Sequence, residues 1–146
     1  MQGGTVSNVV PDYARGKSDV RAALPADMDT VSNALTMITG STSVPGTTST
    51  LDGGWRFAPM ARTPAVTALA GLAQKCAMDL GFEVVDAPTG GVSYANLLAA
   101  LGLPVLDGLG PVGGLDHSPR EYILASSIVP RTALLAPLML RFGEHA

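Results

Sequence analysis

Residues 89–117 read TGGVSYANLLAALGLPVLDGLGPVGGLDH, and this stretch decides how the rest of the chain is interpreted. It holds two glycine-rich turns, at 90–91 and 113–114, with a short apolar helical pattern after the first. The run at 104–109 (PVLDGL) predicts a buried strand, and His117 follows the second turn. We therefore interpret the upstream segments as a scaffold that positions this stretch, and the downstream segment as a helix that anchors it.

The composition is that of one ordinary domain or two small pieces. The chain has 146 residues, of which 47% are hydrophobic and 14% charged, so it can form a packed core and has no disorder signature. A formal net charge of -3 and the lack of a Lys/Arg run argue against a nucleic-acid partner. The single cysteine, Cys76, excludes an intrachain disulfide and is expected to be a buried structural thiol.

The two ends of the sequence predict neither a signal peptide nor a membrane span. The first ten residues, MQGGTVSNVV, have no basic region followed by a long apolar run, so a cytoplasmic protein is expected. The apolar stretch at 123–142 contains Arg131 and two prolines, which argues against a membrane-spanning helix.

The first part of the chain predicts the order strand, strand, helix, strand. A hairpin is expected from 5–10 and 13–23, around a turn at Pro11. A helix is expected from Pro25 to Gly40, and a strand within 51–60. This order is half of a split β-α-β sandwich, whose sheet would have an unfilled edge.

The second part begins at a boundary near residues 62–64. Thr63 is a predicted N-cap, Pro64 suits the first helical position, and Gly81 is a predicted stop for a helix over 64–80. A strand, a helix, a second strand and a terminal helix are then expected at 82–85, 93–101, 104–109 and from Ser127 onward.

The residues alone leave two interpretations open at each candidate site. Gly90 and Gly91 precede Ser93 and a helix start, so they form either an anion-binding loop or simply a tight turn. His117 follows a strand end and is either a ligand that enters a cleft or a structural histidine. His145 lies in the C-terminal tail and is expected to play no part.

A complete catalytic centre is not predicted. Ser93 is not in a GxSxG elbow, and the sequence has no HxD, HExxH or Glu-Glu motif. A hydrolytic zinc site needs about three protein ligands and an open position. Asp107 and Asp116 are placed near the cleft only by inference from the chain order.

Several motifs together resemble the zinc-dependent carboxypeptidase and deacylase family, which includes glutamate carboxypeptidase, acetylornithine deacetylase, succinyl-diaminopimelate desuccinylase and the aminoacylases. Residues 89–96 (TGGVSYAN) resemble its TGGxSDAN loop, and residues 108–123 resemble its GLGPxGxxxHxxxEyv strand end. Residues 7–21 (SNVVPDYARGKSDVR) resemble its hairpin, and residues 55–60 (WRFAPM) its exit strand. The motifs occur in the family's order over nearly the whole chain.

The resemblance implies an α/β fold with an α+β lid, of which the chain would be the C-terminal part. Residues 1–63 would be the C-terminal half of a ferredoxin-like dimerisation lid, and residues 64–146 the last segment of the catalytic domain. Family members bind two zinc ions and form a homodimer through the lid. The general base and most metal ligands belong to an N-terminal half that has no match here.

The resemblance also implies a role for individual residues. His117 matches the final zinc ligand, and no catalytic residue is matched. The residues expected to bind the substrate carboxylate and the reacting carbonyl region are Asn8, Arg21, Gly90, Gly91 and Ser93. The implied activity is cleavage of amide bonds in peptides or N-acyl amino acids that carry a free carboxylate, with another polypeptide supplying the rest of the site. The alternative is a non-catalytic dimerisation or ligand-binding remnant of such an enzyme.

Three departures from the family pattern bear on that choice. Tyr94 stands where the family has an aspartate, which puts the hydrogen bonding of the loop in question. Leu115 and Asp116 replace small residues before His117. Pro137 is expected to kink or end the last helix, because proline lacks the backbone N–H.

Overall fold

The computed structural model describes residues 1–143, which mix helices with two small antiparallel sheets. The helices are α1 (Pro25–Gly40), α2 (Pro64–Asp79), α3 (Ala95–Ala100) and α4 (Ala125–Gly143). The strands are β1 (Gln2–Gly3), β2 (Ala14–Arg15), β3 (Gly113–Gly114) and β4 (Tyr122–Ile123). The predicted mixture of helices and strands is confirmed at this coarse level. His145 lies outside the described residues.

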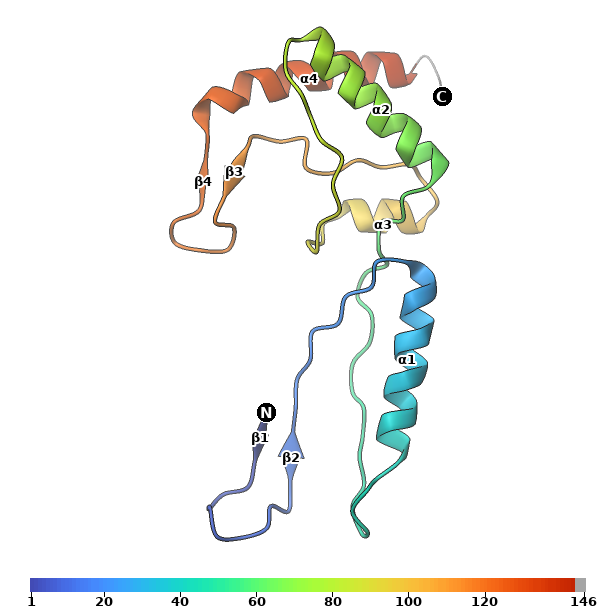
Figure 1. Ribbon diagram of the computed structural model, residues 1–146, viewed down its shortest axis with the longest axis vertical. Coiled ribbons are helices and arrows are strands. Elements are labelled where there is room, and N and C mark those ends of the chain that lie inside the picture. The colour runs from blue at the N-terminus through green and yellow to red at the C-terminus, as the bar shows by residue number, and fades with distance from the viewer. Residues whose placement is uncertain (144–146) are drawn as a thin grey trace.

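The described chain is elongated, and its elements gather at two ends (Figure 1). The β1–β2 hairpin and α1 occupy one end, while α2, α3, α4 and the β3–β4 hairpin occupy the other (Figure 1). Two extended stretches of chain, one before α1 and one before α2, run between the ends (Figure 1). None of the helices in residues 1–143 is long and apolar enough to cross a bilayer.

The first hairpin forms, but not from the strands expected at 5–10 and 13–23. Gln2 pairs with Arg15 and Gly3 with Ala14, so residues 5–10 become the loop of the hairpin. Gly4 turns the chain out of β1 with φ +70°, a conformation that favours glycine. The β-branched residues of the loop therefore have no strand opposite them to pair with.

Helix α1 begins and ends where the sequence predicts. The backbone N–H of Leu24 donates to Asp27 Oδ2 at 3.1 Å, which satisfies one group at the helix start. On its inner side Ser32 Oγ accepts a hydrogen bond of 2.9 Å from Trp55 Nε1. No residue of α1 is fully buried, so this helix gains little from burial of apolar surface.

The described core lies between α2 and α4. Thr63 caps α2 by accepting from the Val66 N–H at 3.2 Å, and Gly81 follows the helix end with φ +83°, as the sequence predicts. Arg141 of α4 ties the two helices together through a 2.9 Å ion pair with Asp79 of α2. The buried apolar residues are Ala70, Ala73, Cys76, Ala77, Leu134 and Leu138.

Helix α4 continues through Pro137 to Gly143. Of the two expected outcomes, a kink or an end of the helix, the end is therefore wrong. The buried residues Leu134 and Leu138 flank Pro137 and pack towards α2, which holds the helix on both sides of the missing hydrogen bond. The helix also begins at Ala125, before the predicted cap. Ser127 Oγ instead accepts from the Val112 N–H at 2.9 Å.

Three predicted strands are absent from the described residues. The segments 51–60, 82–85 and 104–109 are neither helical nor paired, and no ladder hydrogen bond joins them to another strand. Segment 82–85 still has the alternation of a strand, because Phe82 and Val84 pack against the core while Val85 is 85% exposed. These stretches have the side-chain pattern of strands but no neighbouring strand.

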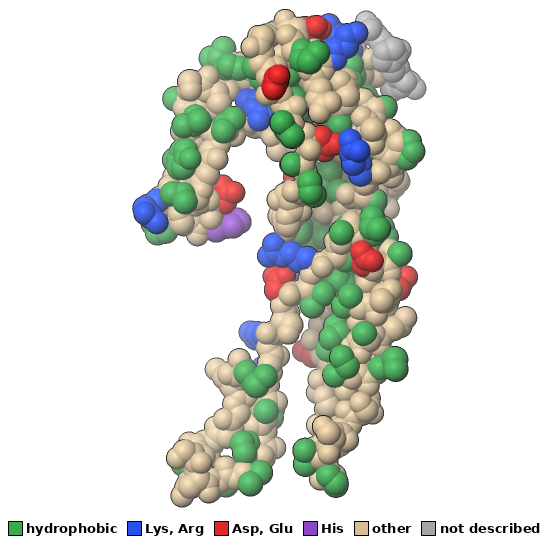
Figure 2. Space-filling view, viewed as in Figure 1, with side chains coloured by type: hydrophobic (Ala, Val, Ile, Leu, Met, Phe, Trp, Pro, Cys, Tyr) green, Lys and Arg blue, Asp and Glu red, His purple; other side chains and the backbone are tan. Residues whose placement is uncertain are grey.

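The described fold leaves an unusually large surface exposed. Its accessible area is 11605 Å², whereas a compact monomer of 14.9 kDa has about 7,000 Å². Hydrophobic side chains are spread over this surface at both ends of the molecule (Figure 2). The described core is therefore small for a chain of this mass, and many large hydrophobic side chains stay exposed.

Candidate functional site

Arg21 and Gly90 meet across 69 residues of sequence. The Arg21 Nη1 donates a hydrogen bond of 2.6 Å to the carbonyl oxygen of Gly90. Arg21 comes from the extended stretch after β2, and Gly90 from the loop before α3. A Cβ atom at Gly90 would lie 3.2 Å from the same Nη1, so glycine allows this close approach.

Asp19 is the second partner of this guanidinium. Its Oδ1 accepts from Arg21 Nε at 3.0 Å, and both side chains are more than half exposed. Hydrogen bonding to Arg21, together with the charge of Arg21, lowers the pKa of Asp19 below its ordinary value. Among the described residues Arg21 Nη2 donates no hydrogen bond, so the guanidinium group of Arg21 keeps N–H donors that are free for a ligand or water.

The loop before α3 is held by its own side chains. Thr89 Oγ1 accepts from the Gly91 N–H at 3.2 Å, and Ser93 Oγ accepts from the Ala95 N–H at 3.0 Å. Tyr94 is 83% exposed and donates no side-chain hydrogen bond within the described residues. The loop is therefore ordered without an aspartate at position 94.

Asn96 connects this loop to the stretch that leads into α2. It is the one buried polar residue of the described chain, at 7% exposure. Its Oδ1 accepts from the Ser93 N–H at 3.0 Å, while its Nδ2 donates to the Ala58 carbonyl oxygen at 2.8 Å. A buried amide with both ends bonded fixes the loop against the segment that carries Ala58.

His117 lies in the turn between β3 and β4, away from any group of metal ligands. Its side chain is exposed, and its backbone N–H donates to Glu121 Oε2 at 3.2 Å. Within residues 1–143 there is no cluster of three or more His, Cys, Asp or Glu side chains that could hold a metal ion. These residues do not fit a zinc centre on their own, because such a centre needs about three protein ligands.

The backbone of this turn is strained at two positions. Leu115 has φ 60° and His117 has φ 63°, and neither is a glycine. Residues with a Cβ rarely adopt this left-handed conformation, because the Cβ approaches the following carbonyl oxygen. The strain at Leu115 coincides with the position where the resembled family has a small residue.

Leu115→Gly is expected to raise the free energy of unfolding by about 1 kcal/mol, because glycine adopts a positive φ without this steric cost. Leu115 is 51% exposed, so the substitution removes little buried surface. Urea denaturation measures the change, and Leu115→Ala is the matched control, since alanine keeps the Cβ and should give no gain. Equal stability of the glycine and alanine variants would contradict the assignment of strain.

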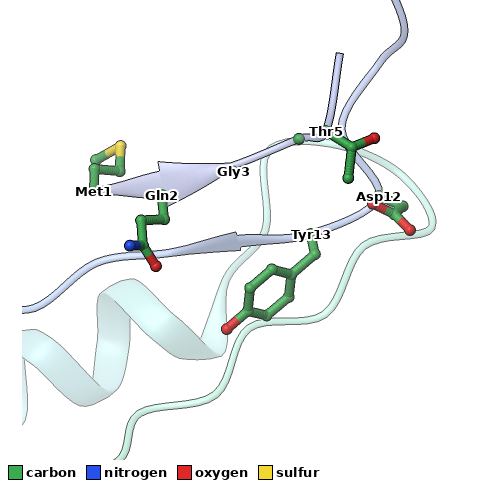
Figure 3. A pocket seen from close by; sticks show the side chains of 7 residues that line it. Met1, Gln2, Gly3, Thr5, Asp12 and Tyr13 are labelled. Carbon is green, nitrogen blue, oxygen red and sulfur yellow. The ribbon is translucent and has the colours of Figure 1, made fainter.

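Asn8, like His117, is a predicted site residue that makes no contact with Arg21 or the glycine loop. It is exposed in the loop between β1 and β2, and none of its side-chain atoms is hydrogen-bonded within the described residues. An open surface hollow lies on the same hairpin, between Gln2, Thr5, Asp12 and Tyr13 (Figure 3). Asn8 is not among the residues that line this hollow. The structure therefore brings Arg21 together with the glycine loop, and it does not bring Asn8 or His117 to that point.

Sequence reasoning missed three residues of this site. Asp19 lies two residues before Arg21, a spacing that brings both side chains to one side of an extended chain. Asn96 lies three residues after Ser93, and Thr89 lies two residues before Gly91, which are short spacings for side-chain to backbone hydrogen bonds. These local patterns were available in the sequence, whereas the contact of Arg21 with Gly90 was not.

Comparison of the chain with known proteins finds no match. No family model matches the chain, and no curated protein or solved structure does.

Proposed function

We propose that the chain provides the carboxylate-binding part of a zinc-dependent carboxypeptidase or N-acyl amino acid amidohydrolase, and one of its metal ligands. The observation that carries the proposal is the 2.6 Å contact between Arg21 and Gly90. The resemblance assigns both residues to the same substrate carboxylate, although 69 residues separate them in the sequence. The substrate class is an amide whose amino acid part carries a free carboxylate.

Arg21 supplies the chemistry for this role. A guanidinium presents donors in a planar fork that matches a carboxylate and binds it through charge-assisted hydrogen bonds. The Gly90 carbonyl and the Asp19 carboxylate orient the fork from two sides, at 2.6 and 3.0 Å. Asp19 also competes with a bound carboxylate, because its own carboxylate already accepts the Arg21 Nε–H at 3.0 Å.

The same proposal includes the two-domain layout and the partner. Residues 1–63 would belong to the dimerisation lid and residues 64–146 to the catalytic domain, with the Arg21–Gly90 and Asn96–Ala58 contacts between them. The large exposed surface supports a second polypeptide that completes the site. Zinc would polarise the scissile amide in the completed enzyme. The residues of this chain would bind and orient the substrate carboxylate.

Arg21→Gln is expected to weaken binding of N-acetyl-L-alanine about tenfold or more, because hydrogen bonds to charged groups contribute roughly 1.5–3 kcal/mol. Asp19→Asn is expected to strengthen binding, since the competing charge is removed while the side-chain shape stays. Isothermal titration calorimetry measures both, and Arg15→Gln, which removes an exposed cation on β2, is the control. Unchanged affinity in Arg21→Gln would contradict the proposal.

The second candidate is a non-catalytic remnant that binds ligands or dimerises. The absence of a metal-ligand cluster from residues 1–143 is compatible with both candidates, because the first also places most metal ligands on a second polypeptide. The two candidates differ in the role of His117. In the first candidate His117 becomes a metal ligand when the second polypeptide is present, and in the second candidate it does not.

The purified chain is expected to take up no stoichiometric zinc at micromolar protein, and His117→Ala is expected to behave identically. A single exposed imidazole does not form a tight zinc site, because structural and catalytic sites use three or four protein ligands. Equilibrium dialysis with metal analysis measures the uptake. Tight zinc binding that disappears in His117→Ala would contradict this account and would show that the chain builds a centre by itself.

A further inference from the structure

We propose that Asp107 and Gly108 form a site of spontaneous covalent modification, at which the aspartate converts to isoaspartate through a cyclic succinimide. The inference is independent of the proposed function. It rests on one contact: the Gly108 backbone nitrogen lies 2.8 Å from Asp107 Oδ1.

The contact places the nucleophile beside the carbon that it attacks. A C–O bond is about 1.23 Å long, so the Gly108 nitrogen is no more than about 4 Å from Asp107 Cγ. Reactions within a molecule accelerate strongly when the reacting atoms are held near contact distance. The folded chain therefore holds the Asp107 carboxyl group on the side of the Gly108 nitrogen, which is the side from which the ring closes.

The surroundings of the pair permit the ring to form. Asp107 and Gly108 are both exposed, and a Cβ at Gly108 would meet no heavy atom within 4 Å. Gly108 has φ 72°, and it has no side chain to hinder approach of its nitrogen. No ladder hydrogen bond restrains residues 104–109, so the backbone can adjust.

The chemistry needs only water. The Gly108 nitrogen bonds to Asp107 Cγ, and the amide proton leaves with the carboxyl hydroxyl as one molecule of water. Water then adds to the ring at either carbonyl. Opening at Cγ restores aspartate, whereas opening at the main-chain carbonyl carbon leaves Gly108 attached through Cγ, which is isoaspartate.

The product would change the chain next to the core. Isoaspartate lengthens the main chain by one carbon and moves the carboxylate onto the former main-chain carbon. Leu109 follows directly and packs against the cluster of Cys76, Ala77 and Leu134. Modification at position 107 would therefore displace a residue that supports the α2–α4 core.

The chain contains its own control, at Asp52-Gly53. This pair has the same two residues and is also exposed, but Gly53 has φ 123°. Of the two pairs in the described chain, Asp107–Gly108 has the hydrogen bond from the glycine N–H to the aspartate carboxylate and Asp52–Gly53 does not. The two dipeptides therefore differ in geometry and not in identity. If the two aspartates form isoaspartate at different rates in the folded chain and at similar rates in the unfolded chain, the difference is an effect of the fold.

The test follows both sites in the full chain during incubation at neutral pH in H₂¹⁸O. Each passage through the ring adds one ¹⁸O atom, and electron-transfer fragmentation in the mass spectrometer distinguishes isoaspartate from aspartate. We expect conversion at Asp107 to be at least about tenfold faster than at Asp52, equivalent to about 1.4 kcal/mol of barrier. In urea the two rates should become similar.

Two results would overturn the proposal. One is a rate of isoaspartate formation at Asp107 that is equal to or below the rate at Asp52 in the folded chain. The other is a difference that persists in urea, since it would then come from the flanking sequence and not from the contact. Asp107→Glu should incorporate almost no ¹⁸O at position 107, which verifies that the label enters there.

Discussion

Leu134→Ala is expected to lower the free energy of unfolding by about 2–5 kcal/mol, the range for a buried leucine that leaves a cavity. Leu134 is 0% exposed and, with Cys76, is one of the two largest fully buried side chains. The rest of the buried core consists largely of alanines, which cannot move in to fill the space. Small domains have only about 5–15 kcal/mol of stability in total, so this change would remove a large share of the free energy of unfolding.

Leu140→Ala is the matched control. It removes the same atoms from the same helix, but Leu140 is 72% exposed. Substitutions at such surface positions change stability by no more than about 0.5 kcal/mol. Urea denaturation followed by circular dichroism measures both variants, and equal effects would show that α2 and α4 do not pack as described.

The isolated chain is expected to self-associate or to be much more expanded than a compact protein of its length. Its accessible area of 11605 Å² exceeds by more than half the value of about 7,000 Å² for a compact monomer of this mass. Small-angle X-ray scattering should give a radius of gyration well above the value of about 15 Å for 146 compact residues. Light scattering after size exclusion measures the mass at several concentrations.

A variant tests which surface drives association. Val129, Met139 and Leu140 are exposed residues of α4, at 75%, 67% and 72% exposure. Replacing all three with lysine should reduce self-association without loss of helix, since none of them is buried in the core. A sharp monomer peak at all concentrations, with a radius of gyration near about 15 Å for the unmodified chain, would contradict the expectation.

The parts of the fold that the sequence predicts correctly are those that depend on local interactions. Helix α1 ends at Gly40, and α2 is delimited by Thr63, Pro64 and Gly81, because caps and stops act within one turn of the chain. The buried thiol of Cys76 follows from the same apolar periodicity.

The strands could not be predicted because a strand requires a partner. Segments 51–60, 82–85 and 104–109 have the composition of strands, but pairing depends on neighbouring chain that local pattern does not specify. The hairpin shifted for the same reason: Gln2 and Gly3 pair with residues 14–15, while residues 5–10 form the loop.

The candidate site likewise combines local contacts, which the sequence predicts, with a long-range contact, which it does not. The hydrogen bonds of Thr89 and Ser93 lie within a few residues and could be read from spacing. The meeting of Arg21 with Gly90 depends on the path of the chain over 69 residues, so only the family resemblance placed both at one site. The roles proposed for Asn8 and His117 remain predictions of that resemblance.

The most direct measurement of the central claim is a nuclear magnetic resonance titration of the chain with N-acetyl-L-alanine, with N-acetyl-L-alaninamide as the uncharged control. The account predicts that the carboxylate shifts the Arg21 side-chain Nε–H signal and the Gly90 and Gly91 amide signals with one saturation curve, that the amide does not, and that Arg21→Gln abolishes the shifts. Equal shifts with both compounds, or shifts that survive in Arg21→Gln, would show that this site does not bind a carboxylate through Arg21.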